Sequence, residues 1–179
     1  RERARSGAGS GFIRFVLRDR GHERGNESIP RKATSEFQRK VILYRFAIVA
    51  SEYNSVIMDR LIEGAKRALK DQAHVSVIRV PGSFEIPLVA KKAALSKDYD
   101  AIVALGCVLR GETPHFEYIS SSVSHALQNV ALETGVPVGF RILTVDTVQQ
   151  AMERSGESGN KGSEAAETAL AMINVLREI

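Results

Sequence analysis

Short apolar segments alternate with amphipathic segments from residue 41 to the end of the chain, and this alternation restricts the possible folds more than any other feature. The apolar segments are predicted to be strands, at residues 46–51, 75–80, 101–106 and 136–143. The amphipathic segments are predicted to be helices, at residues 56–70, 86–96, 116–134, 147–154 and 162–179. Apolar strands that are each followed by a helix are typical of a parallel sheet with helices on both sides. We therefore predict an α/β domain with three layers, α/β/α, and a four-stranded parallel sheet.

Residues 1–40 differ from the rest of the chain in charge and pattern. They carry 11 Lys and Arg against 5 Asp and Glu, whereas the remaining residues carry 14 against 16. They also contain a run of Gly and Ser and show little hydrophobic periodicity, so we predict a basic, disordered extension at 1–40 and a folded domain at 41–179. Because the net positive charge belongs to the extension, we expect no nucleic-acid binding by the folded domain.

Several classes of protein are disfavoured by composition. Cys107 is the single cysteine, so an internal disulfide framework is excluded, and no cluster of Cys and His suggests a metal site. No apolar run approaches the roughly 18 to 20 residues that span a bilayer, so we expect a soluble chain without a membrane partner. These features favour a cytoplasmic location. The chain does not begin with Met, which leaves import into an organelle open.

The connection between the third strand and its helix, residues 110–118, has the pattern of an anion site. Thr113 is predicted to be the N-cap and Pro114 to occupy the first helical position, which places His115 in the first turn. Free backbone N–H groups and the positive end of the helix dipole meet at such a point. Ligands of parallel sheets bind beyond the carboxyl ends of the strands, where this connection lies. We therefore expect a phosphate to bind here.

His115 is the only histidine predicted to lie at this edge of the sheet. A helix N-terminus disfavours the charged imidazolium, so the side chain is expected to be able to accept a proton. The alternative is a surface histidine in a first turn, without a chemical role.

Other residues near the strand ends carry weaker signals. Tyr53 follows the first strand and offers a flat face to a ring, or is a half-buried aromatic of the fold. Glu85 follows Pro81-Gly82-Ser83-Phe84 and could accept hydrogen bonds from a polyol, or simply begin the next helix. Cys107 directly follows the predicted third strand and has no basic neighbour, so we interpret it as a packing residue.

The glycine-rich segment 156–163 invites comparison with a nucleotide phosphate loop. The match fails because Lys161 precedes its glycine and because a helix, not a strand, comes before the segment. A break between two helices, with Arg154 and Lys161 as solvated charges, is the simpler interpretation.

Taken together, the motifs of residues 46–179 resemble those of the lumazine synthase family. The resemblance is carried, in order, by Phe-Ala-Ile-Val-Ala-Ser-Glu-Tyr-Asn, Val-Pro-Gly-Ser-Phe-Glu-Ile-Pro, Leu-Gly-Cys-Val-Leu-Arg-Gly-Glu-Thr-Pro-His-Phe-Glu-Tyr, Leu-Thr-Val-Asp-Thr, Glu-Arg-Ser-Gly and Gly-Asn-Lys-Gly. It implies a flavodoxin-like fold. It also implies a transferase of riboflavin biosynthesis, which condenses 5-amino-6-ribitylaminouracil with 3,4-dihydroxy-2-butanone 4-phosphate without metal or organic cofactor. The products are 6,7-dimethyl-8-ribityllumazine, phosphate and water.

The resemblance also implies roles for individual residues. His115 would transfer protons during imine formation and phosphate elimination. Glu112 and Thr113 would bind the phosphate through their backbone, together with Arg154 and Lys161. The pyrimidine and ribityl chain of the other substrate would be bound by Tyr53, Ser83, Phe84, Glu85, Cys107, Val108, Leu109 and Phe140.

In this family each site lies between two subunits, with Phe140, Arg154 and Lys161 contributed by a neighbour, so a pentamer or a sixty-subunit icosahedral shell is implied. The chain departs from the family pattern in three places: Tyr53 stands where Phe or Trp is usual, segment 71–75 looks shortened, and the break before Asn160 looks about one residue short. That break influences assembly, so the assembly size stays open. A non-catalytic flavin or lumazine binder, or a shell-forming protein of the same fold, is the alternative function.

Overall fold

The computed structural model describes residues 43–179, so the predicted extension at residues 1–40 lies outside the described residues. Within residues 43–179, no helix has the length and apolar character needed to cross a membrane. The same part of the chain contains no group of three or more His, Cys, Asp or Glu side chains placed to hold a metal ion.

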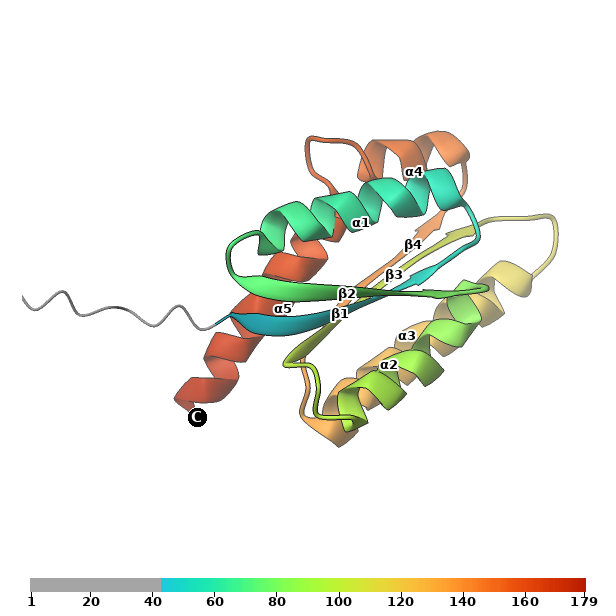
Figure 1. Cartoon of the computed structure of the whole chain (residues 1–179). Helices are drawn as coiled ribbons and strands as arrows, with labels where there is room; N and C mark the ends of the chain where they lie inside the picture. The colour runs from blue at the N-terminus through green and yellow to red at the C-terminus, as the bar shows by residue number, and fades with distance from the viewer. Residues whose placement is uncertain (1–42) are drawn as a thin grey trace, which may run out of the picture. The chain divides into compact units, whose positions relative to one another are not determined.

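The domain is built on one sheet of four parallel strands (Figure 1). The strands are β1 (Tyr44–Ser51), β2 (Ala73–Val80), β3 (Ala101–Leu109) and β4 (Val138–Val145). Their order in the sheet is β2-β1-β3-β4, which matches the first four positions of the flavodoxin-like order. The predicted four-stranded parallel sheet is confirmed. Strands β2 and β4 are its edges, so β1 and β3 lie in the centre, where their residues are almost completely buried.

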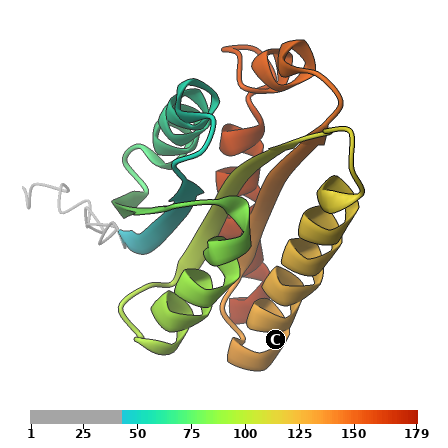
Figure 2. The same ribbon diagram turned by 90° about the vertical axis from the view of Figure 1, so that its right-hand side faces the viewer.

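Helices cover both faces of this sheet, as the alternation predicted. They are α1 (Ser55–Leu69), the short 3₁₀ helix η1 (Ser83–Glu85), α2 (Ile86–Leu95), α3 (His115–Thr134), α4 (Val148–Arg154) and α5 (Lys161–Glu178). Residues of α1, α4 and α5 pack on one face, and residues of α2 and α3 pack on the other. Figure 2 shows α2 and α3 side by side over their face of the sheet.

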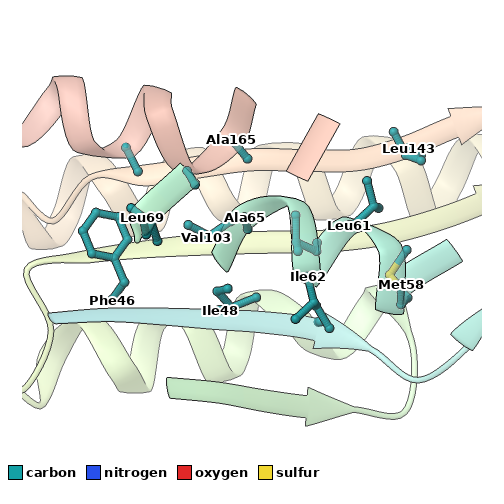
Figure 3. Close-up of a cluster of buried hydrophobic side chains, with 14 of the residues drawn as sticks. Phe46, Ile48, Met58, Leu61, Ile62, Ala65, Leu69, Val103, Leu143 and Ala165 are labelled. Atoms are coloured by element: carbon teal, nitrogen blue, oxygen red, sulfur yellow. The ribbon is translucent and has the colours of Figure 1, made fainter. Parts of the chain in front are cut away.

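Alternate residues of the central strands supply two separate cores, one on each face. In β1, Phe46 and Ile48 point toward α1 and α5, and the residues between them point toward α2 and α3. Figure 3 shows the first core, where Leu61 and Leu69 of α1 meet the sheet. Both leucines are fully buried, and burial of such a side chain stabilises the fold by about 1.5–3 kcal/mol.

Two glycines allow α5 to pack very closely on its neighbours. A Cβ atom at Gly162 would lie 2.0 Å from the carbonyl oxygen of Leu61 in α1. A Cβ atom at Gly139 in β4 would lie 2.2 Å from the carbonyl oxygen of Ala165 in α5. No side chain fits at either position, so both close contacts require glycine. These contacts fix the beginning of α5, where Lys161 lies, against α1 and β4.

The largest difference from the predicted boundaries is at the end of the third strand. β3 continues past Gly106 to Leu109, because its ladder with β4 extends to the pair Leu109 and Val145. Cys107 therefore lies within the strand and does not follow it. Residues 107–109 pair with β4 on one side, whereas the pairing of β3 with β1 ends at Leu105.

Candidate functional site

A cavity of about 420 Å³ lies at the carboxyl ends of β1 and β3. It is lined by Tyr53, Gly82, Ser83, Phe84, Glu85, Cys107, Val108, Leu109, His115 and Ile119. The structure therefore brings together eight of the residues predicted from sequence, from four separate segments of the chain. Ile119 was not predicted, although it lies one turn after His115 on the same helix, a spacing that places both on one face.

Gly106 in β3 explains how η1 reaches this cavity. A Cβ atom at Gly106 would lie 2.6 Å from Ser83 Oγ and 3.2 Å from a methyl carbon of Ile86. The absence of a side chain thus lets η1 rest directly on the strand, and Ser83 is buried there. Strand, glycine and 3₁₀ helix together hold the backbone of residues 83–85 beside the end of β3.

The end of β3 is also joined to the connection after β1. Asn54 adopts a left-handed conformation, with φ of 60°, which Asn tolerates better than most residues. Its Nδ2 donates a hydrogen bond to the carbonyl oxygen of Cys107 at 3.3 Å. Asn54 was not assigned a role from sequence. It positions Tyr53 relative to the strand end.

Cys107 is buried, and burial raises the pKa of its thiol to about 11. The thiol is therefore neutral at physiological pH and is a poor nucleophile. This agrees with the interpretation of Cys107 as a packing residue whose backbone faces the cavity.

Two aromatic side chains at the cavity are largely exposed. Tyr53 is 68% exposed and Phe84 is 58% exposed. Large aromatic side chains are usually covered in a folded protein, so their exposed faces are available to stack on a planar ring or to be covered by another chain.

His115 is the first residue of α3, so its predicted place in the first turn is confirmed. The predicted cap is wrong: Pro114, not Thr113, occupies the cap position, and no side chain caps the helix. The helix begins at His115, one residue after the predicted first helical position at Pro114 and one residue before the predicted range 116–134, because the N–H of Glu117 bonds to the carbonyl oxygen of Pro114 at 3.1 Å. In Figure 1 the turn before α3 extends beyond the strand ends.

Glu112 and Thr113 lie in this turn and are exposed, but they do not line the cavity. Within the described part of the chain, no backbone carbonyl accepts a hydrogen bond from the N–H of Glu112, Thr113 or His115. These groups are therefore free to bind an anion at the positive end of the α3 dipole.

Arg110, just before this turn, makes three contacts. Its Nε donates to Asp146 Oδ1 at 2.7 Å, its Nη1 donates to Glu117 Oε1, and its guanidinium lies 4.2 Å from the centre of the Phe116 ring. The hydrogen bond from Arg110 lowers the pKa of Glu117, and the bonds from Glu117 and Asp146 raise the pKa of Arg110. Both shifts favour the charged forms of Arg110 and Glu117. Sequence reasoning gave Arg110 no role, because ion pairs between separate segments leave no local pattern.

The remaining predicted residues do not join the cavity within one chain. Phe140 in β4 lines a different hollow of about 330 Å³, beside α3. Arg154 and Lys161 line a third hollow of about 320 Å³ along the edge strand β4, with Arg141 and Glu164. The predicted site is thus divided into two regions: the cavity at the ends of β1 and β3, and the edge of β4.

The charges of the β4 edge are partly paired. Glu164 Oε1 accepts a hydrogen bond from Lys161 Nζ at 2.6 Å, and Glu164 Oε2 lies 3.2 Å from Arg141 Nη2. Both hydrogen bonds lower the pKa of Glu164, and the bond from Lys161 has the larger effect. Arg154 is exposed and donates to the carbonyl oxygen of Gln150 at 3.0 Å. Because that acceptor is uncharged, this hydrogen bond does not pair Arg154 with an acidic group.

Asn160 fixes the loop between Arg154 and Lys161. The side chain is buried, and its Oδ1 accepts from the N–H groups of Gly162 and Ser163 at 2.9 and 3.2 Å, as an N-cap of α5. Its Nδ2 lies 3.0–3.1 Å from three carbonyl oxygens, those of Arg60, Ser155 and Gly156. The glycine-rich break is therefore a defined loop built around one buried amide.

Comparison with known proteins identifies the family of the chain. The family model described as 6,7-dimethyl-8-ribityllumazine synthase matches residues 43–177, which include every segment of both regions. A relative from Syntrophus aciditrophicus (strain SB), named 6,7-dimethyl-8-ribityllumazine synthase, is 49% identical over 140 residues, covering 75% of this chain and 91% of the relative. The chain belongs to the 6,7-dimethyl-8-ribityllumazine synthase family.

Proposed function

We propose that the cavity and the β4 edge are the two halves of an active site that makes 6,7-dimethyl-8-ribityllumazine. The substrates are 5-amino-6-ribitylaminouracil and 3,4-dihydroxy-2-butanone 4-phosphate, and phosphate and water are released. Family membership supports this transferase activity in riboflavin biosynthesis. The observation that carries the proposal is that Tyr53, η1, the end of β3 and His115 line one cavity.

The cavity suits the pyrimidine substrate. The exposed ring of Tyr53 provides a face for stacking, and the backbone at the end of β3 provides hydrogen-bonding groups for the edge of the pyrimidine. Glu85, exposed at the end of η1, provides a carboxylate that accepts hydrogen bonds from the ribityl hydroxyls. A mostly apolar cavity with a few polar groups is typical of a small-molecule site.

His115 is placed to move protons between this substrate and the phosphate substrate. It lines the cavity and also begins the helix whose free N–H groups are proposed to bind the phosphate. Imine formation removes protons from the attacking amine, and phosphate elimination removes a proton from carbon. One imidazole between the two substrates can accept and return these protons. Holding both substrates together supplies a further part of the rate enhancement.

The second half of the site is proposed to come from a neighbouring subunit. Arg154 and Lys161 lie in a hollow of their own, separate from the cavity that contains His115. The exposed faces of Tyr53 and Phe84 are consistent with cover from another copy. We propose a homo-oligomer, at least a pentamer, in which Phe140, Arg154 and Lys161 complete the neighbour's cavity. The choice between a pentamer and a sixty-subunit shell is settled by a mass measurement in solution.

Lumazine formation by the purified full chain tests this function. Both substrates are mixed and the product is followed by its absorbance, with the spontaneous reaction without protein as the control. Turnover clearly above the spontaneous rate supports the proposal. Tight binding of lumazine or flavin without turnover would instead support the alternative, a non-catalytic binder of the same fold. The presence of both His115 and Arg154 favours the enzyme, because a carrier has no need of a proton-transfer residue.

A further inference from the structure

Arg110 connects three segments that surround the turn before α3. It is the first residue after β3, Asp146 is the first residue after β4, and Glu117 lies in the first turn of α3. Its side chain binds both carboxylates, and its own N–H bonds to the carbonyl oxygen of Val145 at 2.9 Å. The two ends of segment 110–117 are thereby joined to each other and to the end of β4.

The residues that this turn contributes to the proposed phosphate site lie between these two ends. Glu112, Thr113 and His115 are on the segment that the pair of Arg110 and Glu117 closes. The ring of Phe116 stacks under the same guanidinium, which fixes the residue next to His115. No side chain caps the start of α3, where Pro114 occupies the cap position. The contacts of Arg110 therefore hold the start of the helix in place of a capping side chain.

Resting on the proposed function, we propose that Arg110 is a positioning residue that holds the phosphate-binding turn and His115 in their working geometry through Glu117 and Asp146. Arg110 does not bind the phosphate itself. Its Nη1 and Nε donors are already engaged by the carboxylates of Glu117 and Asp146, so these donors are not available to a phosphate. Arginine suits this task because its planar fork can serve two acceptors and a ring at once.

The test compares substitutions that separate positioning from phosphate binding. Arg110→Ala is expected to lower kcat/KM for the butanone phosphate by about tenfold to a hundredfold, because a small displacement of His115 costs that much. Arg110→Lys keeps the charge but loses the fork, so it restores only part of the loss. Glu117→Gln and Asp146→Asn each lower kcat/KM as well, by about twofold to tenfold, and KM for the pyrimidine stays unchanged in all variants.

The direction in which Glu117→Gln changes KM for the butanone phosphate shows whether Arg110 is a positioning residue or a phosphate ligand. If Arg110 were a phosphate ligand, removal of its carboxylate partner would free the guanidinium and lower KM for the butanone phosphate; that result would overturn the inference. Glu133→Gln is the matched control. Glu133 lies near the other end of α3 and pairs with Lys91 at 2.7 Å, so its substitution is expected to leave activity unchanged.

Amide hydrogen exchange gives a readout that does not depend on turnover. The N–H groups of Glu117 and Tyr118 bond to the carbonyl oxygen of Pro114, so they report on the first turn of α3. Faster exchange of these two amides in Arg110→Ala than in Glu133→Gln supports the inference, and equal exchange contradicts it. If the wild-type protein shows no turnover, the proposed function fails, but this measurement still decides whether Arg110 holds the turn.

Discussion

The cavity at the strand ends and the β4 edge are built in different ways. The cavity is built from central strands: Ser83 rests on Gly106, and Asn54 holds the carbonyl of Cys107. The β4 edge lies on the outermost strand and presents charged side chains, held by one buried amide, Asn160. The first region is shaped for a planar molecule and the second for an anion. The side chains of Arg154 and Lys161 line a hollow separate from the cavity that contains His115, and the proposal that two copies of the chain share one site rests on this separation.

The largest expected effect is on the rate of lumazine formation and concerns a residue that lines the cavity. His115→Ala is expected to slow lumazine formation by about 10²- to 10⁴-fold, because it removes the group that transfers protons. His125→Ala is the matched control, since His125 lies on the same helix, is exposed and forms its hydrogen bonds with Ser121 of that helix. Steady-state rates with both substrates measure the difference. Equal rates for the two variants would remove His115 from the mechanism.

The next largest effect is expected on stability, through the loop beside the β4 edge that Asn160 holds. Asn160→Ala removes a buried side chain that accepts two N–H groups and contacts three carbonyl oxygens, so we expect a loss of about 2–4 kcal/mol in the free energy of unfolding. Urea denaturation measures it, with Asn174→Ala as the control at an exposed position. Unchanged stability would show that the loop does not depend on Asn160.

The smallest expected effect is on stability at high pH and concerns Cys107. Burial raises the pKa of its thiol to about 11. A raised pKa keeps the folded thiol protonated after the unfolded thiol has ionised. Its contribution to stability is therefore complete below the ordinary thiol pKa of 9.0 and is lost as the pH rises to about 11. Alkylation by iodoacetamide should stay slow up to about pH 10 and accelerate above it. Fast alkylation at pH 8 would contradict the buried, neutral thiol.

The fold could be predicted because its signal is local. Apolar strands such as β1 and β3 and one-faced helices such as α1 are visible in the order of residues, and their alternation implies a parallel sheet. Exact ends were less predictable. β3 continues to Leu109 because β4 pairs with it, and α3 begins at His115 because Pro114 provides the first carbonyl. Both depend on partners that a local pattern does not contain.

The residues that line the cavity could also be predicted from the sequence. Tyr53, Glu85 and His115 follow strands of one parallel sheet, so they were expected at one edge, and they do line one cavity. Residues that hold the site were missed. Arg110 and Asn160 act through contacts with distant segments, and sequence spacing gives no sign of those contacts.

Mixing two inactive variants tests most directly whether one site needs two copies of the chain. His115→Ala damages the cavity and Arg154→Ala damages the β4 edge, so each variant alone should be nearly inactive. When the two are coexpressed, random assembly gives about a quarter of the sites an intact His115 from one subunit and an intact Arg154 from the next. The account predicts about a quarter of wild-type activity. Activity no greater than that of the separate variants would contradict a shared site.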